Sequence, residues 1–99
     1  MEEKILNLLS MAARARRVIS GMTLTVEAVK KGEAKLLLLA KDASEDTKKD
    51  VHILAERNSL NIYEILNKNV LGGIIGKEER AVVAVLDEGF SKAFEKIII

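Results

Sequence analysis

Two short, unbroken apolar runs dominate the hydrophobic pattern, at residues 36–40 and at residues 81–86. A half-exposed strand would alternate apolar and polar residues, and neither run alternates. Both runs are too short for a core helix, and Gly32 and Asp42 bracket the first of them. We therefore predict two strands that are buried on both faces, which requires helices above and below the sheet.

The remaining apolar positions mostly recur every three or four residues, the spacing of an amphipathic helix. Gly32 follows Lys30 and Lys31, a helix stop signal, while Ser44 and Asn67 are typical helix caps. We predict helices over residues 2–16, 23–31, 44–58 and 67–76 and from residue 87 onward, with further strands at 18–19 and 61–66. In the second helix, Leu24 and Ala28 are expected on the inner face.

Helices and strands thus alternate along the chain, which indicates an α/β fold with a central sheet between two helical layers. The paired glycines at 72 and 73 lie inside a predicted helix, where each costs about 1 kcal/mol relative to alanine. A pair tolerated at that cost suggests close approach of another backbone. The final residues 97–99 are all isoleucine, and we expect them either to pack on the core or to form a self-association surface.

The chain has 99 residues, which is enough for one hydrophobic core, so we expect a single domain over residues 1–99. No apolar run approaches the ~20 residues of a membrane span, and the N-terminal residues lack the pattern of a secretory signal. We expect a cytoplasmic protein. The chain has no cysteine, which excludes disulfides, thiolate metal sites and cysteine nucleophiles.

No catalytic constellation emerges from the sequence. His52 is the single histidine and has no cysteine near it in the chain, so a surface or packed role is favoured over a metal site. The glycines at 72, 73 and 76 follow no predicted strand and precede no lysine with serine or threonine, as a phosphate-binding loop requires. We predict that the protein is not an enzyme and needs no metal or nucleotide cofactor.

The net charge of +1 gives no reason by itself to expect a polyanionic partner, but basic residues concentrate locally. Residues 10–31 contain five basic side chains against one acid, Glu27. Gly21 opens a helix whose free N–H groups can bind phosphate or a base edge, with Arg16 and Arg17 just before it. Aromatic content is only 3%, so RNA would be recognised by shape rather than by stacking on exposed rings. An ordinary solvated face remains the alternative.

Several segments resemble the kink-turn-binding ribosomal proteins, the family of the archaeal "seven Ae" and eukaryotic "thirty e" proteins. They are Gly-Glu-Ala-Lys-Leu at 32–36, Leu-Gly-Gly-Ile-Ile-Gly at 71–76 and the apolar strand at 81–86. Residues 76–90 further resemble the bacterial YlxQ-type members. The resemblance implies a three-layer α-β-α sandwich around a four-stranded mixed sheet. It also implies a sharply bent, kink-turn-like RNA as ligand, contacted by residues 21–27 and 76–80.

The helix entry departs from the family pattern, which has asparagine, glutamate and lysine where this chain has Thr23, Leu24 and Glu27. Only Gly21 is kept. A carboxylate at Glu27 repels phosphate where the family has a cation, so we expect the standard kink-turn complex to be weakened.

Two functions follow from these observations. The first is a ribosome-associated protein that binds structured RNA, and the second is a protein-interaction module on the same fold. Burial of Leu24 would favour the first and its exposure beside Met22 the second. The candidate RNA-binding residues are Arg16, Arg17, Gly21, Met22, Thr23, Leu24, Glu27, Lys41, Gly76, Lys77 and Arg80.

Overall fold

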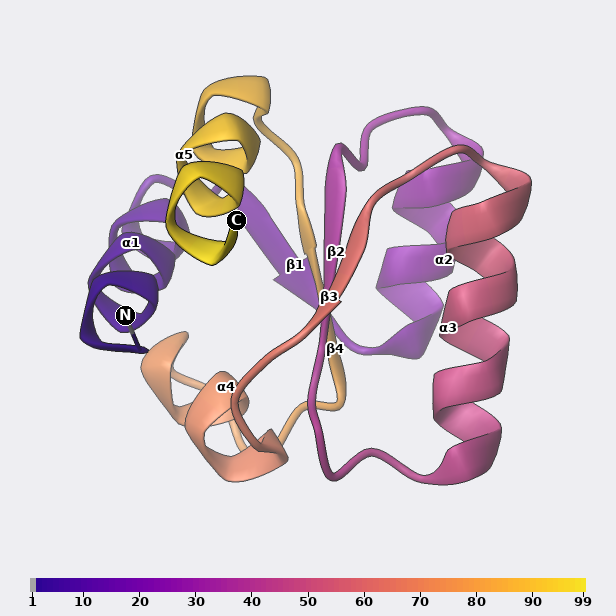
Figure 1. Cartoon of the computed structure of the whole chain (residues 1–99), viewed down its shortest axis with the longest axis horizontal. Coiled ribbons are helices and arrows are strands. Elements are labelled where there is room, and N and C mark those ends of the chain that lie inside the picture. The colour runs from indigo at the N-terminus through magenta and orange to yellow at the C-terminus, as the bar shows by residue number, and fades with distance from the viewer. Residues whose placement is uncertain (1) are drawn as a thin grey trace.

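A computed structural model describes residues 2–99 and shows a four-stranded sheet with helices on both faces (Figure 1). Helices and strands alternate along the chain, as the hydrophobic pattern predicts. The elements are α1 (Glu2–Arg14), β1 (Val18–Ser20), α2 (Met22–Lys30), β2 (Leu36–Leu39), α3 (Glu45–Arg57), β3 (Ile62–Glu64), α4 (Lys68–Ile74), β4 (Val82–Val85) and α5 (Glu88–Ile98).

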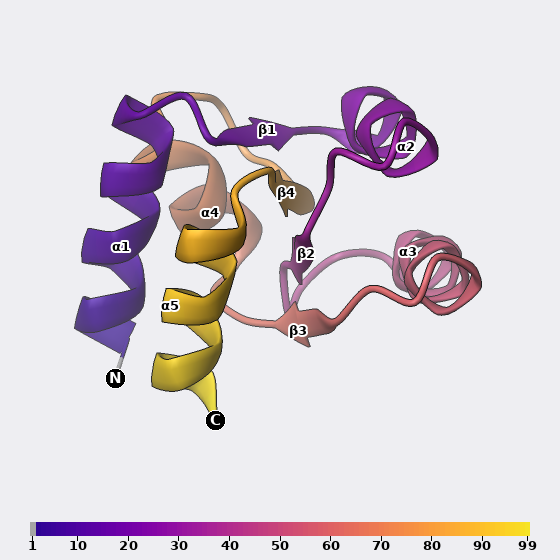
Figure 2. The same cartoon turned by 90° about the horizontal axis from the view of Figure 1, so that it is seen from above.

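The sheet is mixed, with strand order β1-β4-β2-β3. β2 and β3 run parallel, whereas β4 is antiparallel to both β1 and β2. Helices α1, α4 and α5 cover one face of the sheet, and α2 and α3 cover the other (Figure 2). The architecture is therefore the α/β three-layer sandwich that the resemblance implies.

The two apolar strands are buried on both faces, as predicted. Every residue of β2 and β4 is buried, and the side chains of each strand divide between two cores. Leu36 and Leu38 belong to the cluster that includes Phe94 of α5, while Leu37 and Leu39 belong to the cluster on the α2 and α3 side. Because successive strand residues point to opposite faces, one run of four leucines serves both cores.

The second helix differs from its prediction in which residues face the sheet. It begins at Met22, and its buried residues are Thr25, Ala28 and Val29. Leu24, which we expected on the inner face, is 52% exposed. The buried positions follow the helical spacing of three and four, and Leu24 lies one residue, about 100°, off that stripe.

The paired glycines differ in their surroundings. A Cβ built on Gly72 would lie 1.8 Å from the backbone oxygen of Glu78, so the predicted close approach of another backbone is confirmed there. A Cβ on Gly73 would meet nothing within 4 Å. Gly72 is thus required by the loop that packs on α4, and Gly73 is not.

The C-terminal isoleucines pack on the core only in part. Ile97 and Ile98 pack against the core cluster of α1 and α5, whereas Ile99 is 88% exposed. Within residues 2–99, no helix combines the length and the apolar character needed to cross a membrane.

Candidate nucleic-acid interface

Three loops meet at the end of the sheet that is lowest in Figure 1, where β1 and β2 finish and β4 begins. The N–H of Gly21 donates to the carbonyl of Val82 at 3.0 Å, and that of Ala40 donates to Ala81 at 2.8 Å. The start of α2, the loop before β4 and the loop after β2 are therefore neighbours. Most of the candidate residues lie in these three segments.

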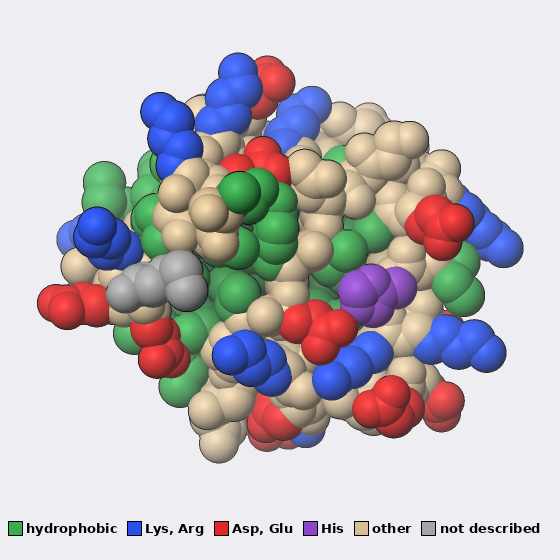
Figure 3. All heavy atoms as spheres, viewed as in Figure 1, with side chains coloured by type: hydrophobic (Ala, Val, Ile, Leu, Met, Phe, Trp, Pro, Cys, Tyr) green, Lys and Arg blue, Asp and Glu red, His purple; other side chains and the backbone are tan. Residues whose placement is uncertain are grey.

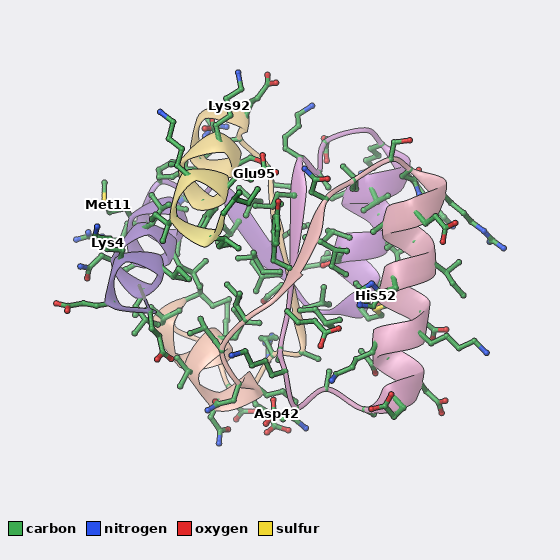
Figure 4. All side chains as sticks on the ribbon, viewed as in Figure 1. Lys4, Met11, Asp42, His52, Lys92 and Glu95 are labelled. Atoms are coloured by element: carbon green, nitrogen blue, oxygen red, sulfur yellow. The ribbon has the colours of Figure 1, made fainter. Side chains whose placement is uncertain are left out.

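A series of hydrogen bonds fixes the loops relative to one another. Asp42 Oδ1 accepts from the N–H of Lys68 at 2.8 Å, and the carbonyl of Lys68 accepts from the N–H of Arg80 at 3.1 Å. Arg80 Nε then donates to Ser20 Oγ at 3.2 Å. Figure 4 shows Asp42 at this lower end of the molecule. The predicted set omitted Asp42, Lys68 and Ser20, because hydrogen bonds between distant loops leave no periodic signal in a sequence.

The N-terminus of α2 is open to an anion. Gly21 is its N-cap, with φ +90°, and within residues 2–99 no side chain caps the first turn. The corresponding ends of the three later helices are capped by Ser44, Asn67 and Asp87. The first-turn N–H groups of α2 carry partial positive charge and lack a side-chain acceptor, so an anionic oxygen can bind there.

Position 21 requires glycine because of its backbone conformation and not because a side chain there would clash. A Cβ there would meet nothing within 4 Å, but its φ of +90° is one that other residues rarely adopt. The adjacent side chains Met22, Thr23 and Leu24 are all exposed. The helix entry therefore combines free backbone donors with an accessible surface.

Helices α1 and α4 end in the same way, and each ending places a cation beside the interface. In α1 the N–H groups of Arg16 and Arg17 donate to Ala13 and Ala12, with Arg16 at φ +58°. In α4 the N–H groups of Gly76 and Lys77 donate to the carbonyls of Gly73 and Gly72, with Gly76 at φ +76°. Both are Schellman endings, which normally carry glycine at the left-handed position.

Arg16 occupies that left-handed position without being glycine. A left-handed conformation costs a side-chain-bearing residue about 1–2 kcal/mol, so this is a site of local strain. Strained residues are concentrated at functional sites. Ser59, after the end of α3, has a similar φ of +54°, so the conformation of Arg16 marks local strain and does not by itself assign this residue to the interface.

The cations at this end of the molecule are not neutralised by nearby acids. Arg16, Arg17, Lys41 and Lys77 are exposed, and Arg80 is partly buried. Within the described part of the chain, the recorded ion pairs all involve Glu64 and not these residues. Glu27 and the two glutamates before Arg80 are exposed as well, so the interface is a set of separated cations with acids among them, not a continuous basic patch.

Lys41 lies apart from Arg16 and Lys77 although it is at the same end. Lys41 lines a pocket between α1 and the segment after β3, together with Glu2 and Asn67. Arg16 and Lys77 flank the groove beside β1, on the other side of β4. The predicted residues therefore form two subsets, with Arg80 between them.

The ionic cluster around His52 is separate from this interface. His52 Nε2 lies 2.9 Å from Glu64 Oε2, and Lys48 Nζ lies 3.3 Å from Glu64 Oε1. The hydrogen bond with His52, aided by Lys48, holds the pKa of Glu64 below its ordinary value. In Figure 3 the histidine lies among side chains of both signs, on the face that carries β3. Within residues 2–99 no group of three or more His, Asp or Glu is arranged to hold a metal ion.

The exposure of Leu24 favours the protein-interaction alternative over RNA binding. Leu24 is 52% exposed and Met22 is 36% exposed, so both present apolar surface beside the helix entry. An exposed leucine can, however, pack on the face of a ribose or a base as well as on an apolar side chain. The exposure of Leu24 therefore does not by itself distinguish an RNA-binding surface from a protein-binding surface.

The chain matches the ribosomal protein L7Ae/L30e/S12e/Gadd45 family over residues 3–95. It is 43% identical over 84 residues to the RNA-binding protein YlxQ of Bacillus subtilis (strain 168), covering 85% of this chain and 84% of that protein. It is 35% identical over 83 residues to the large ribosomal subunit protein eL30 of Methanocaldococcus jannaschii, covering 82% and 76%. These names describe RNA-binding and ribosomal proteins, not enzymes, in agreement with the prediction.

Two solved structures have the same fold. A protein of unknown function from Bacillus halodurans C superposes with a TM-score of 0.89 at 38% identity, covering 94% of both chains. The Giardia lamblia 15.5kD RNA binding protein superposes with a TM-score of 0.80 at 20% identity, covering 98% of this chain and 83% of that one. At 20% identity the second likeness concerns the fold alone.

Proposed function

Because this chain belongs to the ribosomal protein L7Ae/L30e/S12e/Gadd45 family, we propose that it binds structured RNA with a sharp, kink-turn-like bend. The observation that carries the proposal is the uncapped N-terminus of α2, which faces solvent between exposed cations. The similarity to proteins named YlxQ and eL30 supports RNA as the ligand, and ribosomal RNA in the cytoplasm is one source of it.

The backbone of the α2 entry supplies the first part of the binding mode. The N–H groups of Met22, Thr23 and Leu24 lie in the first turn, where phosphate oxygens or base acceptors can receive them. Backbone donors at fixed positions recognise geometry rather than sequence, because they read where an acceptor lies and not which base carries it. Such a site favours RNA whose backbone is already bent toward the helix end.

The side chains around that entry supply the electrostatic part. Arg16, Arg17, Lys77 and Lys41 are exposed and contribute phosphate contacts, which position RNA without selecting its sequence. Arg80 is held against Ser20, so its guanidinium is oriented before RNA arrives. Preorganisation of this kind lowers the entropy lost on binding.

Glu27 opposes this mode and sets the expected strength. It is exposed on α2, one turn beyond the entry, where it brings a negative charge toward phosphate. A single charge repulsion of this kind is worth about 1 kcal/mol or more near the surface. We therefore expect binding that is weaker than that of a chain with lysine at position 27.

Affinity for a synthetic kink-turn RNA, compared with a straight duplex of the same length, tests the proposal. The triple variant Thr23→Asn, Leu24→Glu, Glu27→Lys restores the family pattern and should bind the bent RNA more tightly, with a smaller change for the duplex. Glu33→Lys is the control for the charge reversal at position 27, since it makes that one change at an exposed position beyond the other end of α2. The triple variant as a whole gains only one positive charge, because Leu24→Glu adds a carboxylate, so a pure charge effect would favour the control. Equal gains for both RNAs in both variants would mean that charge alone acts, and no shape-specific site would exist.

A second candidate, a protein-interaction module, is favoured by the exposure of Leu24 beside Met22. It predicts that the parent binds neither RNA and that the triple variant gains nothing. It also predicts that Leu24→Ser weakens an interaction with an apolar protein surface.

A further inference from the structure

We propose that the open edge of β3 and the pocket at its end bind an extended segment of a partner protein, which adds to the sheet as a further strand. This site goes beyond the proposed function. It lies at the opposite edge of the sheet from β1, because the strand order is β1-β4-β2-β3. The pocket has a volume of about 570 Å³, which is enough for a large side chain.

The backbone of β3 has unpaired groups along its outer side. Within residues 2–99, β2 is the one sheet neighbour of β3. The N–H of Ile65 donates to the carbonyl of Leu39 in β2 at 2.9 Å. Because the backbone groups of successive strand residues point to opposite sides, Ile62 and Glu64 direct theirs away from β2. Figure 2 shows none of the labelled helices and strands on that side of β3.

Sheet edges are normally protected against such pairing, and β3 has little protection. Charged side chains, proline and bulges are the usual devices, and the chain contains no proline. The one charged residue of the strand is Glu64, whose carboxylate lies 3.3 Å from Lys48 Nζ and 2.9 Å from His52 Nε2. Both partners belong to α3, so the carboxylate is held toward that helix. The edge itself stays accessible to another strand.

The pocket supplies a place for one side chain of the added strand. It lies on the face of the sheet that α1, α4 and α5 cover, and its apolar walls are Ile5, Ile65, Leu66 and Ile98. Figure 3 shows apolar side chains at the surface between α1, α5 and β3. Alternate side chains of a strand beside β3 point to this face, so one of them can enter the pocket. In such complexes the main-chain hydrogen bonds give affinity and the pocket gives specificity.

The pocket wall formed by Leu66 is fixed before a segment binds. Leu66 has φ +60°, which is an outlier for a bulky residue. Its carbonyl accepts from the N–H of Lys41 at 2.9 Å, which ties the turn after β3 to the loop after β2. A strained conformation persists only where the surrounding structure holds it. A preformed wall lowers the entropy lost on binding.

The charges at the rim specify the segment further. Glu2 of α1 and Lys41 line the pocket, and both are exposed. The ion pairs recorded within residues 2–99 involve neither of them. A complementary segment therefore has a large apolar residue between a basic residue, which lies toward Glu2, and an acidic residue, which lies toward Lys41. Because Lys41 is also among the proposed RNA contacts, the test is made without RNA.

The test first selects a segment and then asks where it binds. A phage-displayed library of random octapeptides is selected on the whole protein, and the most enriched peptide is synthesised with a fluorescent label. Ile98→Phe narrows the pocket, and Ile99→Phe is the matched control, because Ile99 is exposed and outside the pocket lining. Affinities are measured by fluorescence anisotropy, and amide hydrogen exchange of the parent is measured with and without the peptide.

We expect enriched peptides that have a large apolar residue at a constant position, flanked by opposite charges. Ile98→Phe should lower affinity about 10-fold or more, as should alanine at the apolar position of the peptide, the size expected for a buried apolar side chain. Ile99→Phe should bind as the parent does. The bound peptide should slow hydrogen exchange at the N–H groups of Ile62 and Glu64. Should Ile98→Phe fail to fold, Ile98→Met obstructs the same pocket with a more flexible side chain.

Three results would overturn the inference. The first is that no peptide is enriched. The second is a peptide that binds Ile98→Phe as tightly as the parent and leaves exchange at Ile62 and Glu64 unchanged, since it binds elsewhere. The third is a protein that sediments as a dimer with both amides already protected, which would show that the edge pairs with a second copy of the chain. None of these results bears on RNA binding, so the proposed function is tested separately.

Discussion

Replacing Arg16 with glycine should make the protein more stable although it removes a side chain. Arg16 has φ +58°, a conformation that costs about 1–2 kcal/mol for a residue with a side chain and almost nothing for glycine. Glycine also makes the unfolded chain more flexible, which offsets about 0.5–1 kcal/mol. The net gain therefore lies between about 0 and 1.5 kcal/mol and centres near 0.75 kcal/mol, or roughly 3–6 °C in Tm for a domain of this size.

Arg17→Gly is the matched control, because it removes the same charge at the next residue, whose φ is not positive. Glycine at position 17 makes the unfolded chain more flexible and relieves no left-handed strain, so Arg17→Gly should lower Tm. The difference between the two variants isolates the left-handed strain and should reach about 1–2 kcal/mol in the free energy of unfolding by urea titration. If Arg16→Gly proves no more stable than Arg17→Gly, the strain argument is wrong.

The same two variants connect stability to binding. Both should lower affinity for structured RNA, and each lost phosphate contact should reduce the slope of log affinity against log salt by about 0.7–0.9. Arg16→Gly would then be more stable but bind more weakly. That combination is the signature of a residue kept for function at some cost in stability.

Other variants test the core, the loop and the ionic cluster. Gly72→Ala should destabilise the fold by about 3 kcal/mol or more, because its Cβ would clash with the Glu78 backbone, whereas Gly73→Ala should be neutral or stabilise by up to about 1 kcal/mol; equal effects in urea titrations would contradict this account. Leu37→Asp should prevent folding, since it places an unpaired charge in a fully buried strand, and a native-like circular dichroism spectrum with a cooperative melt would disprove the central-strand assignment. Because the folded pKa of Glu64 is lowered, its stabilisation is present above the ordinary pKa of a glutamate and is lost as pH falls through the lowered value. The stability advantage of the parent over Glu64→Gln should therefore shrink on acidification, and a pH-independent difference would argue against it.

The fold could be predicted largely from the sequence because its strongest signals are local. Four consecutive leucines cannot be half exposed, and Ser44 and Asn67 cap their helices through bonds to residues three positions away. The inward face of α2 was harder to predict from the sequence. Leu24 and Thr25 are both compatible with a helix, and only the position of the helix on the sheet decides which of the two is buried.

The site was less accessible to sequence reasoning for a physical reason. Its geometry depends on hydrogen bonds between loops that are distant in the chain, such as Arg80 with Ser20 and Lys68 with Asp42. The left-handed turn at Arg16 was also hidden, because a sequence that lacks glycine at a helix end normally indicates an ordinary backbone there. The resemblance to a family pointed to the entry of α2 and the loop before β4, which the structure brings together, but the groove beside β1 required coordinates.

Titration of the isotopically labelled protein with a kink-turn RNA, followed by amide chemical shifts, tests the central claim most directly. The account predicts saturable shifts at residues 21–24 and 76–80, at Arg16 and around Lys41, with little change along the outer face of α3. A straight duplex should produce smaller shifts at the same concentrations. Absence of saturable shifts, or shifts confined to α3 and α5, would contradict the assignment of this end of the sheet as an RNA-binding surface.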